Sequence, residues 1–284
     1  MIYPRECQTH AIVADHYDEL DSIYRSLWGE HVHHGLWLTG QETPEQAVLA
    51  LSDRVGAKLG IAPGASIVDI GCGYGATARH FAAQGAVVTG FTLSQAQLDA
   101  APAAASVTLR CKDWLENDLP VASFDGAYAI ESSEHMSDKP RFFAEARRVL
   151  RPGATFVVCA WLASDKPTRW QIDHLLEPIC YEGGLPSMGD AADYRAMAAG
   201  AGFTCVEYED VSRAVARTWT ICLRRFTSAM ITDSEIRRKV LHARNRRFAL
   251  SLPRLILGYR TGAMRYGIFT FRADRRSEKS CSAA

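Results

Sequence analysis

The sequence predicts an α/β protein, a seven-stranded sheet with helices on both faces. Between residues 66 and 161, short runs rich in Val, Ile and Phe alternate with helical segments, as in parallel strands joined by helices. One strand–helix junction, "DIGCGYGA", carries three glycines in five positions. The length of 284 residues, with 48% hydrophobic and 23% charged residues, is typical of one large domain with added elements.

The expected strands follow the apolar runs in chain order. They cover residues 66–71, 86–92, 106–111, 124–131, 154–161, 203–212 and 264–273. Helices are expected at residues 76–84, 94–105, 139–150, 168–183 and 190–202, with Ser94 as the N-cap of the second. The sequence "RPG" at residues 151–153 is expected to end the helix before it.

The chain divides into five expected parts. Residues 1–60 form a helical lid, 61–214 the core, 215–262 a helical cap inserted between the last two strands, 263–273 the closing strand and 274–284 a disordered tail. In the first cap helix one stripe contains Trp219, Leu223, Phe226 and Met230. A second cap helix is expected near Ser234, and a third from Pro253, because proline is favoured in the first turn.

The net charge of zero hides a strong asymmetry. From Val211 to the C-terminus there are 17 Arg plus Lys against 4 Asp plus Glu, a charge of +13. This excess fits either solvated helix faces or a surface that meets an anionic membrane or a phosphorylated substrate. Aromatic residues in this region follow helical spacing and do not interleave regularly with the arginines. Nucleic acid is therefore not an expected partner.

The sequence also indicates the cellular compartment of the protein. No apolar run reaches the roughly 20 residues of a membrane span. The first 20 residues carry early charges and lack an apolar stretch, so no signal peptide is expected. Eight cysteines without a CxxC pair indicate reduced thiols, with neither a disulfide framework nor a zinc site. We expect a cytoplasmic protein that reaches a membrane, if at all, only peripherally through the basic cap.

The glycine loop Gly71, Gly73 and Gly75 follows a strand and opens a helix, where backbone N–H groups face a ligand. A dinucleotide would call for an acidic residue about 20 positions further on, but residues 90–93 read "GFTL". No GK[ST] follows, which excludes a P-loop. Asp69 instead ends the strand before the loop, and its carboxylate suits a cofactor that carries an ammonium or sulfonium.

Other strand ends carry matching chemistry. Thr92 can offer a hydroxyl to a ribose, while Asp113 and Trp114 can accept from an adenine amino group and cover the base. The strand at 124–131 runs into "SSEHM". Taken singly, each of these residues is better explained by a structural role, such as a capping Asp or a core Trp. Because the carboxyl ends of parallel strands meet in one crevice, their combination predicts a single binding site.

These motifs identify a family by resemblance. The segments "VDIGCGYGA", "GFTLS", "KDW", "FDGAYAIESSEHM" and "LRPGATFVV" resemble the signatures of class I S-adenosylmethionine-dependent methyltransferases, which have a Rossmann-like core. The stretches 17–37, 131–139 and 258–270 are similar to the γ-tocopherol methyltransferase family, kin of sterol C-24 methyltransferases and cyclopropane-fatty-acid synthases. The resemblance covers about residues 17–273, although the middle of the cap follows the family less closely.

The resemblance implies S-adenosyl-L-methionine as the cofactor and assigns roles along the crevice. The amino-acid half of the cofactor is assigned to Asp69, Gly71, Gly73 and Gly75. The ribose is assigned to Thr92, Leu93 and Gln97, and the adenine to Asp113 and Trp114. It adds Tyr17 and the turn His33–His34–Gly35 as a lid over the methionine carboxylate. Such a lid would exclude water from a reactive sulfonium.

The candidate base is the cluster of Glu131, Glu134 and His135. Acidic and imidazole groups gathered at one strand end tend to have shifted pKa values. In the cyclopropane-synthase kin a similar Glu-His pair lies at the methyl-transfer centre, and Glu134 and His135 occupy the matching positions. The alternatives are that Glu131 only anchors its loop and that His135 is a structural donor. The cluster His31, His33 and His34 lacks suitable metal-ligand spacing, so no metal is expected.

The predicted function is methyl transfer to carbon or oxygen of an apolar small molecule, such as a prenylated phenol, a quinol or an isoprenoid. Sterol- or alkene-type C-methylation and N-methylation of an alkaloid-like amine stay open. The non-enzymatic alternative is a basic cofactor-binding module on membrane or RNA. The sequence leaves both a monomer and a homodimer possible.

Overall fold

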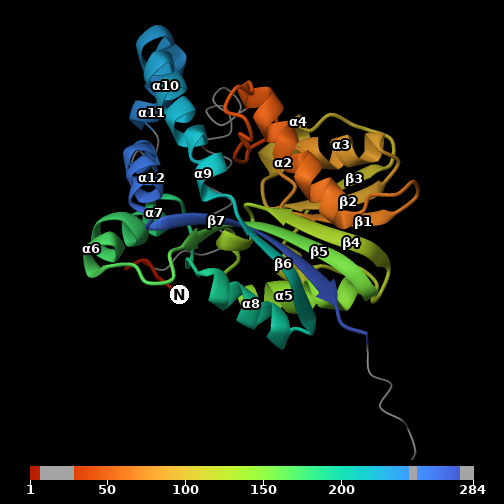
Figure 1. Cartoon of the computed structure of the whole chain (residues 1–284). Helices are drawn as coiled ribbons and strands as arrows, with labels where there is room; N and C mark the ends of the chain where they lie inside the picture. Colours follow the sequence, from red (N-terminus) through yellow and green to blue (C-terminus); the bar gives the residue numbers. More distant parts are fainter. Residues whose placement is uncertain (7–28, 243–247, 276–284) are drawn as a thin grey trace, which may run out of the picture.

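The computed structural model describes residues 1–6, 29–242 and 248–275 (Figure 1). Its centre is a seven-stranded sheet of order β3-β2-β1-β4-β5-β7-β6. The strands are β1 (Ser66–Ile70), β2 (Val87–Thr92), β3 (Val107–Cys111), β4 (Phe124–Ile130), β5 (Leu150–Ala163), β6 (Phe203–Asp210) and β7 (Met264–Ala273). The chain passes from β1 outward to β3 and then returns to β4, so a topological switch point lies between β1 and β4. The predicted seven-stranded fold is confirmed.

The first five strands pair in parallel, as the alternation of strands and helices predicts. The closing strand β7 instead runs antiparallel between β5 and β6. All four strands β1 to β4 therefore point their carboxyl ends at the same edge of the sheet, and the polar residues that follow them are brought together there.

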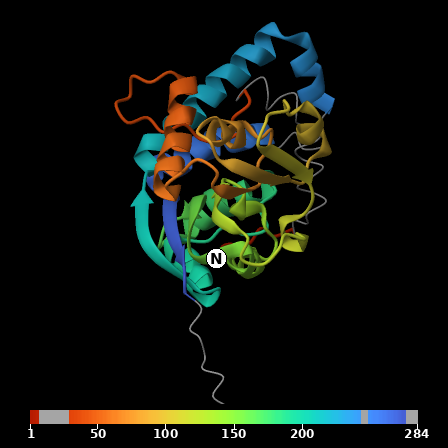
Figure 2. The same ribbon diagram turned by 90° about the vertical axis from the view of Figure 1, so that its right-hand side faces the viewer.

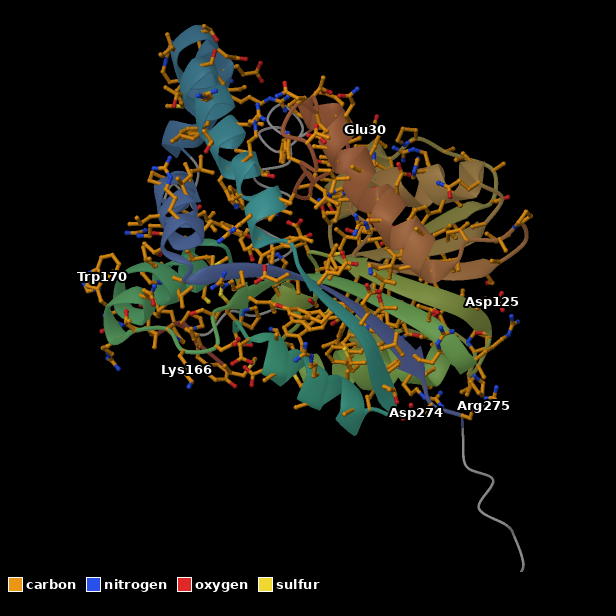
Figure 3. The ribbon with its side chains drawn as sticks, in the orientation of Figure 1. Glu30, Asp125, Lys166, Trp170, Asp274 and Arg275 are labelled. Carbon is orange, nitrogen blue, oxygen red and sulfur yellow. The ribbon has the colours of Figure 1, made fainter. Side chains whose placement is uncertain are left out.

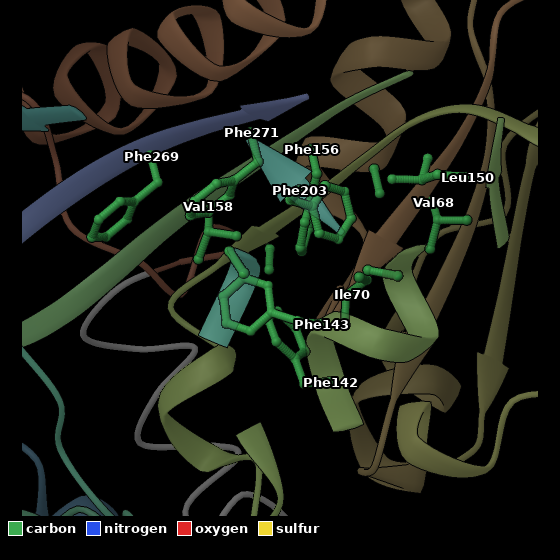
Figure 4. Close-up of a cluster of buried hydrophobic side chains, with 14 of the residues drawn as sticks. Val68, Ile70, Phe142, Phe143, Leu150, Phe156, Val158, Phe203, Phe269 and Phe271 are labelled. Carbon is green, nitrogen blue, oxygen red and sulfur yellow. The ribbon is translucent and has the colours of Figure 1, made fainter. Parts of the chain in front are cut away.

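Helices cover both faces of the sheet. In the described residues, the helices before β6 are α2 (Pro44–Leu59), α3 (Ala76–Ala83), α4 (Gln95–Ala100), α5 (Lys139–Val149), α6 (Arg169–Gln171), α7 (Glu177–Glu182) and α8 (Ala191–Gly200). On one face α2 and α3 bury Leu51, Val55 and Phe81 against the sheet. On the other face the rings of Phe142 and Phe143 from α5 pack against β5 and β7 (Figure 4).

In the described residues between β6 and β7 there are four helices: α9 (Ser212–Val215), α10 (Arg217–Thr232), α11 (Ser234–His242) and α12 (Phe248–Thr261). The helices α10 and α11 stand beyond one end of the sheet (Figures 1 and 2). From the predicted stripe, Trp219, Leu223 and Phe226 join a core cluster with residues of α7 and α12. Within the described ranges, no helix is long and apolar enough to cross a bilayer.

Two predicted helix boundaries are wrong, both next to a proline. The helix expected at 94–105 ends at Ala100, since Ala101 precedes a proline and is extended. The third cap helix begins at Phe248 with Pro253 inside it, so this proline does not mark its start. The helix expected at 168–183 is confirmed over residues 169–182, where α6, a π-helical segment (Ile172–Leu176) and α7 follow one another without a break. The π-helical segment lies just before Pro178, which has no N–H to donate.

The "RPG" segment also behaves differently from the prediction. It ends α5 but lies inside β5, which starts at Leu150 rather than Ala154. The pairing with β4 shifts register between Phe124 and Gly126, so residues 151–153 form a bulge. Of the expected lid and tail, residues 7–28 and 276–284 lie outside the described residues.

Candidate active site

A cavity opens at the carboxyl ends of the strands, and we call it the strand-end cavity. The space between its walls is about 690 Å³ when the solvent-open part is included. Of the predicted site residues, its wall contains Gly71, Gly73, Thr92, Leu93, Gln97, Asp113, Trp114, Glu131 and His135. The structure thus brings together residues that are separated by up to 64 positions in the chain.

A second hollow, of about 350 Å³ with its solvent-open part included, also borders the glycine loop, and we call it the glycine-loop cavity. Asp69, Gly71 and Gly73 line it, together with Tyr128 from β4. Residues 30–33 of the N-terminal segment form the opposite wall. Glu30, labelled in Figure 3, is also held by an ion pair with Arg79. Because Gly71 and Gly73 line both cavities, one extended ligand can reach from Asp69 to Asp113.

Asp69 is buried at the end of β1 and accepts a hydrogen bond of 2.6 Å from the hydroxyl of Tyr128. Burial raises the pKa of Asp69 to about 7, although the bond from Tyr128 opposes the rise. A cation brought into the glycine-loop cavity would favour the ionised carboxylate. This is the electrostatic behaviour expected of a partner for an ammonium group.

The raised pKa of Asp69 predicts a pH-dependent affinity. Below pH 7 the free protein holds a proton on Asp69, and an ammonium ligand must displace it. Affinity for S-adenosylhomocysteine, whose amino group stays charged below pH 7, is therefore expected to fall about tenfold between pH 7 and pH 5.5. Calorimetric titration measures this change. Asp69→Asn should bind more weakly, with no pH dependence in that window; an equal pH dependence in both proteins would assign the titration to another group.

The three glycines of the loop have different roles. Gly71, Gly73 and Gly75 all have positive φ, at 85°, 53° and 69°. No atom lies within 4 Å of the position of a Cβ on Gly73, so this glycine leaves open space for a ligand. Gly75 lines neither cavity; it caps α3, and a Cβ there would meet Leu109 at 2.7 Å. Its role is therefore close packing of helix against strand.

At the far end of the strand-end cavity, side chains are held by local hydrogen bonds. Thr92 donates to Gln97 at 2.9 Å and accepts from the N–H of Ser94 at 3.2 Å. The carboxylate of Asp113 accepts from the N–H of Leu115 and caps the short 3₁₀ turn η1 (Trp114–Glu116).

Trp114 is buried more deeply than we expect of a ring that stacks on the adenine of a cofactor. Only 2% of its surface is exposed, and its indole N–H donates to the carbonyl of Phe142 at 3.3 Å. Its ring packs edge-on against Phe91, with centroids 5.5 Å apart. Trp114 therefore forms the cavity floor and also belongs to the core.

The three candidate catalytic residues follow β4 on the short turn η2 (Ser133–His135) and its approach. Glu131 accepts bonds from four donors; burial alone would raise its pKa, but the charge and hydrogen bonds of His34 lower it to about 2. Glu134 is buried and accepts from the N–H of Trp161 and from Ser133, and burial raises its pKa to about 7. Of the two residues Glu134 and His135, only His135 lines the strand-end cavity.

Lys139 is a site-supporting residue that the sequence analysis missed. Its ammonium is buried and donates to the carbonyls of Glu134 and Met136, at 3.0 and 3.1 Å, and to the hydroxyl of Ser187 at 3.0 Å. Burial lowers its pKa to about 8. A lysine at a helix start is usually exposed, so no sequence pattern indicated that it holds the η2 turn.

His31, His33 and His34 contact their neighbours in the chain and the carboxylate of Glu131. His31 and His33 contact each other at 3.3 Å, and burial lowers the pKa of His31 to about 3. In the part of the chain that the structure describes, no group of three His, Cys, Asp or Glu side chains is placed to hold a metal. His34 pairs with Glu131 and lines neither cavity. Tyr17 lies outside the described residues.

Comparisons with known proteins place the chain in a family. Residues 68–158 match the model of the methyltransferase domain. A 27-O-demethylrifamycin SV methyltransferase of Amycolatopsis mediterranei is 33% identical over 219 residues, which cover 74% of this chain and 80% of that protein. A probable chloroplastic tocopherol O-methyltransferase of Oryza sativa subsp. japonica is 29% identical over 288 residues, 94% of this chain and 79% of the relative.

The fold agrees with solved structures. A cyclopropane synthase from Mycobacterium tuberculosis superposes with a TM-score of 0.82 at 22% sequence identity, over 94% of this chain and 99% of that one. The chain belongs to the class I S-adenosylmethionine-dependent methyltransferases. It is a small-molecule methyltransferase with S-adenosyl-L-methionine as cofactor.

The residues of both cavities fit this cofactor. The buried carboxylate of Asp69 faces a hollow next to the open side of Gly73, where an amino-acid group would lie. The strand-end cavity offers hydroxyl, amide and carboxylate groups for a nucleoside. We therefore keep the predicted division of roles along the cavities as a proposal, with Gly75 as a packing residue.

Proposed function

We propose that the protein methylates a hydroxyl group of an apolar aromatic small molecule, such as a prenylated phenol or quinol. The observation that carries this proposal is the position of His135, in the cavity wall beside the glycine loop and next to the buried Glu134. The two relatives above are named for methylation of tocopherol and of an O-demethylated rifamycin, which supports an oxygen nucleophile.

The proposed chemistry needs a base and good positioning. S-adenosylmethionine, when bound, supplies an electrophilic methyl group on a sulfonium. Alignment of the acceptor oxygen behind the methyl carbon supplies most of the rate enhancement. His135 takes the proton of the acceptor hydroxyl as its oxygen attacks the methyl carbon. Glu131 is unsuited to this role, because its pKa is about 2 and four donors already occupy its oxygens. Glu134 supports the turn from its buried position.

A methyl-transfer screen tests the proposal. The protein is incubated with S-adenosylmethionine that carries a deuterated methyl group and, in parallel, with prenylated phenols, quinols, sterols and amines. We expect a trideuteromethyl ether from a phenol or quinol, identified by mass spectrometry and NMR. A product methylated only at carbon or nitrogen would refute the oxygen acceptor while leaving the methyltransferase assignment intact.

Carbon methylation of a sterol or alkene is the second candidate, because aromatic rings from core and cap gather beside the site. A carbocation would need ring faces directed at the substrate. In the described residues, however, Trp161 and Trp219 meet edge-on at 88°, and both rings pack against His34. These contacts indicate that the rings form a structural cluster and are not directed at a substrate. We therefore favour methylation of oxygen over methylation of carbon.

We also propose that the protein is cytoplasmic and that the cap meets an anionic membrane surface carrying the apolar substrate. Arg224, Arg237, Arg238 and Arg260 are exposed on the cap helices, and Ile231 is 71% exposed. Basic side chains near exposed apolar ones are suited to an anionic interface. Sedimentation with phosphatidylserine vesicles tests this contact, which salt should weaken; equal sedimentation with neutral vesicles would contradict it.

A further inference from the structure

Glu131 joins three separate parts of the molecule. One carboxylate oxygen accepts from the backbone N–H of His34 at 2.7 Å and from the hydroxyl of Tyr266 at 2.8 Å. The other accepts from Nδ1 of His34 at 2.9 Å and from the indole N–H of Trp161 at 2.8 Å. The donors come from the N-terminal segment, β5 and β7, so a single side chain ties that segment to the sheet.

The backbone at Glu131 is held in an unfavourable conformation. Its φ is +54°, in the left-handed region that non-glycine residues rarely adopt. Its N–H donates to the carbonyl of Cys159 at 2.9 Å, which fixes the turn where β4 ends. Strain of this kind persists where surrounding contacts determine the geometry, and it is common at functional sites.

His34 extends the connection to the cap. It is 1% exposed, and its ring lies 5.0 Å from the ring of Trp219 on α10 and 5.8 Å from that of Tyr259 on α12. Its Nε2 is 3.4 Å from the hydroxyl of Tyr259, at the long end of hydrogen-bond distance. The next residue, Gly35, donates its N–H to Thr218 of α10 at 3.1 Å.

The segment held in this way forms part of the cofactor site. Val32 lines the strand-end cavity, and His31, Val32 and His33 line the glycine-loop cavity. His34 and Tyr266 line neither cavity, and each reaches the site only through Glu131 or the segment. We propose that Glu131 and His34 form a latch that positions residues 31–33 as a wall of the cofactor site and joins that wall to the cap.

On this proposal Glu131, His34 and Tyr266 are positioning residues, and none of them takes part in proton transfer. The latch holds without an acceptor molecule, because each of its partners belongs to this chain. Its contribution should therefore appear in the affinity for S-adenosylhomocysteine, measured with the whole protein and no acceptor. A wrong choice of acceptor class would leave this test unaffected.

Two substitutions of His34 provide the sharpest comparison. The amide nitrogen of Asn lies near the place of Nδ1 and can still donate to Glu131, whereas the amide of Gln lies near the place of Nε2. His34→Gln is expected to weaken S-adenosylhomocysteine binding by about tenfold or more, and His34→Asn by less than about threefold. Tyr266→Phe removes one donor and should weaken binding by about threefold to tenfold. Calorimetry gives the dissociation constants, and thermal unfolding confirms that each variant is folded.

A matched control is Glu145→Gln on α5. Glu145 accepts from Asn117 and Arg148, both at 2.8 Å, and lines neither cavity. This variant should leave the dissociation constant unchanged even where it lowers stability. Equal affinities for wild type, His34→Gln and Tyr266→Phe would overturn the latch. Equal losses in His34→Gln and His34→Asn would show that only the packing of the imidazole ring matters, which would overturn it as well.

Discussion

Replacement of His135 by Asn is expected to lower kcat for methyl transfer to a phenol or quinol by about 10²–10⁴-fold, the usual contribution of a general base. His135 lies in the wall of the strand-end cavity, while the neighbouring Glu134 is buried beneath it. The loss should be largest near neutral pH and smaller at high pH, where the phenol ionises without assistance. Single-turnover assays at saturating S-adenosylmethionine measure the chemical step directly.

His80→Asn is the control for this substitution. His80 contacts Asp53 at 2.7 Å on the outer side of α3 and lines neither cavity, so its loss should leave kcat unchanged. Glu134→Gln distinguishes the two residues of the turn. If Glu134→Gln abolished turnover while His135→Asn retained it, Glu134 would be the base and our assignment would be wrong.

The second large effect is expected for Gly71→Ala. Gly71 has a φ of +85°, and a Cβ there would overlap the Cβ of Ser132, whose hydroxyl is bonded to the carbonyl of Ile70. Backbone strain and overpacking together should lower the free energy of unfolding by about 2–5 kcal/mol. The loop must also move, so affinity for S-adenosylhomocysteine should fall at least about tenfold, or 1.4 kcal/mol.

Gly153→Ala separates these two causes. Gly153 has a similar φ of +81°, but no atom lies within 4 Å of its added Cβ, and it is remote from the cofactor site in the bulge of β5. Gly153→Ala should lower the free energy of unfolding by only about 1–2 kcal/mol and leave cofactor binding intact. Chemical denaturation and calorimetry measure both quantities. Equal losses in the two variants would mean that the contact between Gly71 and Ser132 is unimportant.

The fold was predictable because its signals are local. Apolar runs of strand length, helical spacing and the glycine loop at residues 71–75 are properties of short stretches, and the structure confirms the sheet that they predict. The failures concern prolines in unexpected positions. Pro253 lies within α12 rather than at its start, although an interior proline removes one backbone hydrogen bond from a helix.

The candidate site was predictable only where the chemistry lies directly at a strand end. Asp69, Gly71 and Thr92 follow this rule, and the structure brings them to two adjoining cavities. The partners of Glu131 could not be predicted, because they lie 30, 97 and 135 residues away in the sequence. A pattern search detects a carboxylate next to a strand, but only packing shows that its oxygens are already occupied.

The most direct test of the site is a crystal structure of the protein with S-adenosylhomocysteine. We expect its amino group against Asp69, its ribose near Thr92 and Gln97, and its sulfur directed toward the η2 turn that carries His135. Its nucleobase should lie at the Asp113 end of the strand-end cavity. A sulfur directed away from His135, or a ligand bound outside the two cavities, would contradict both the site and the proposed base.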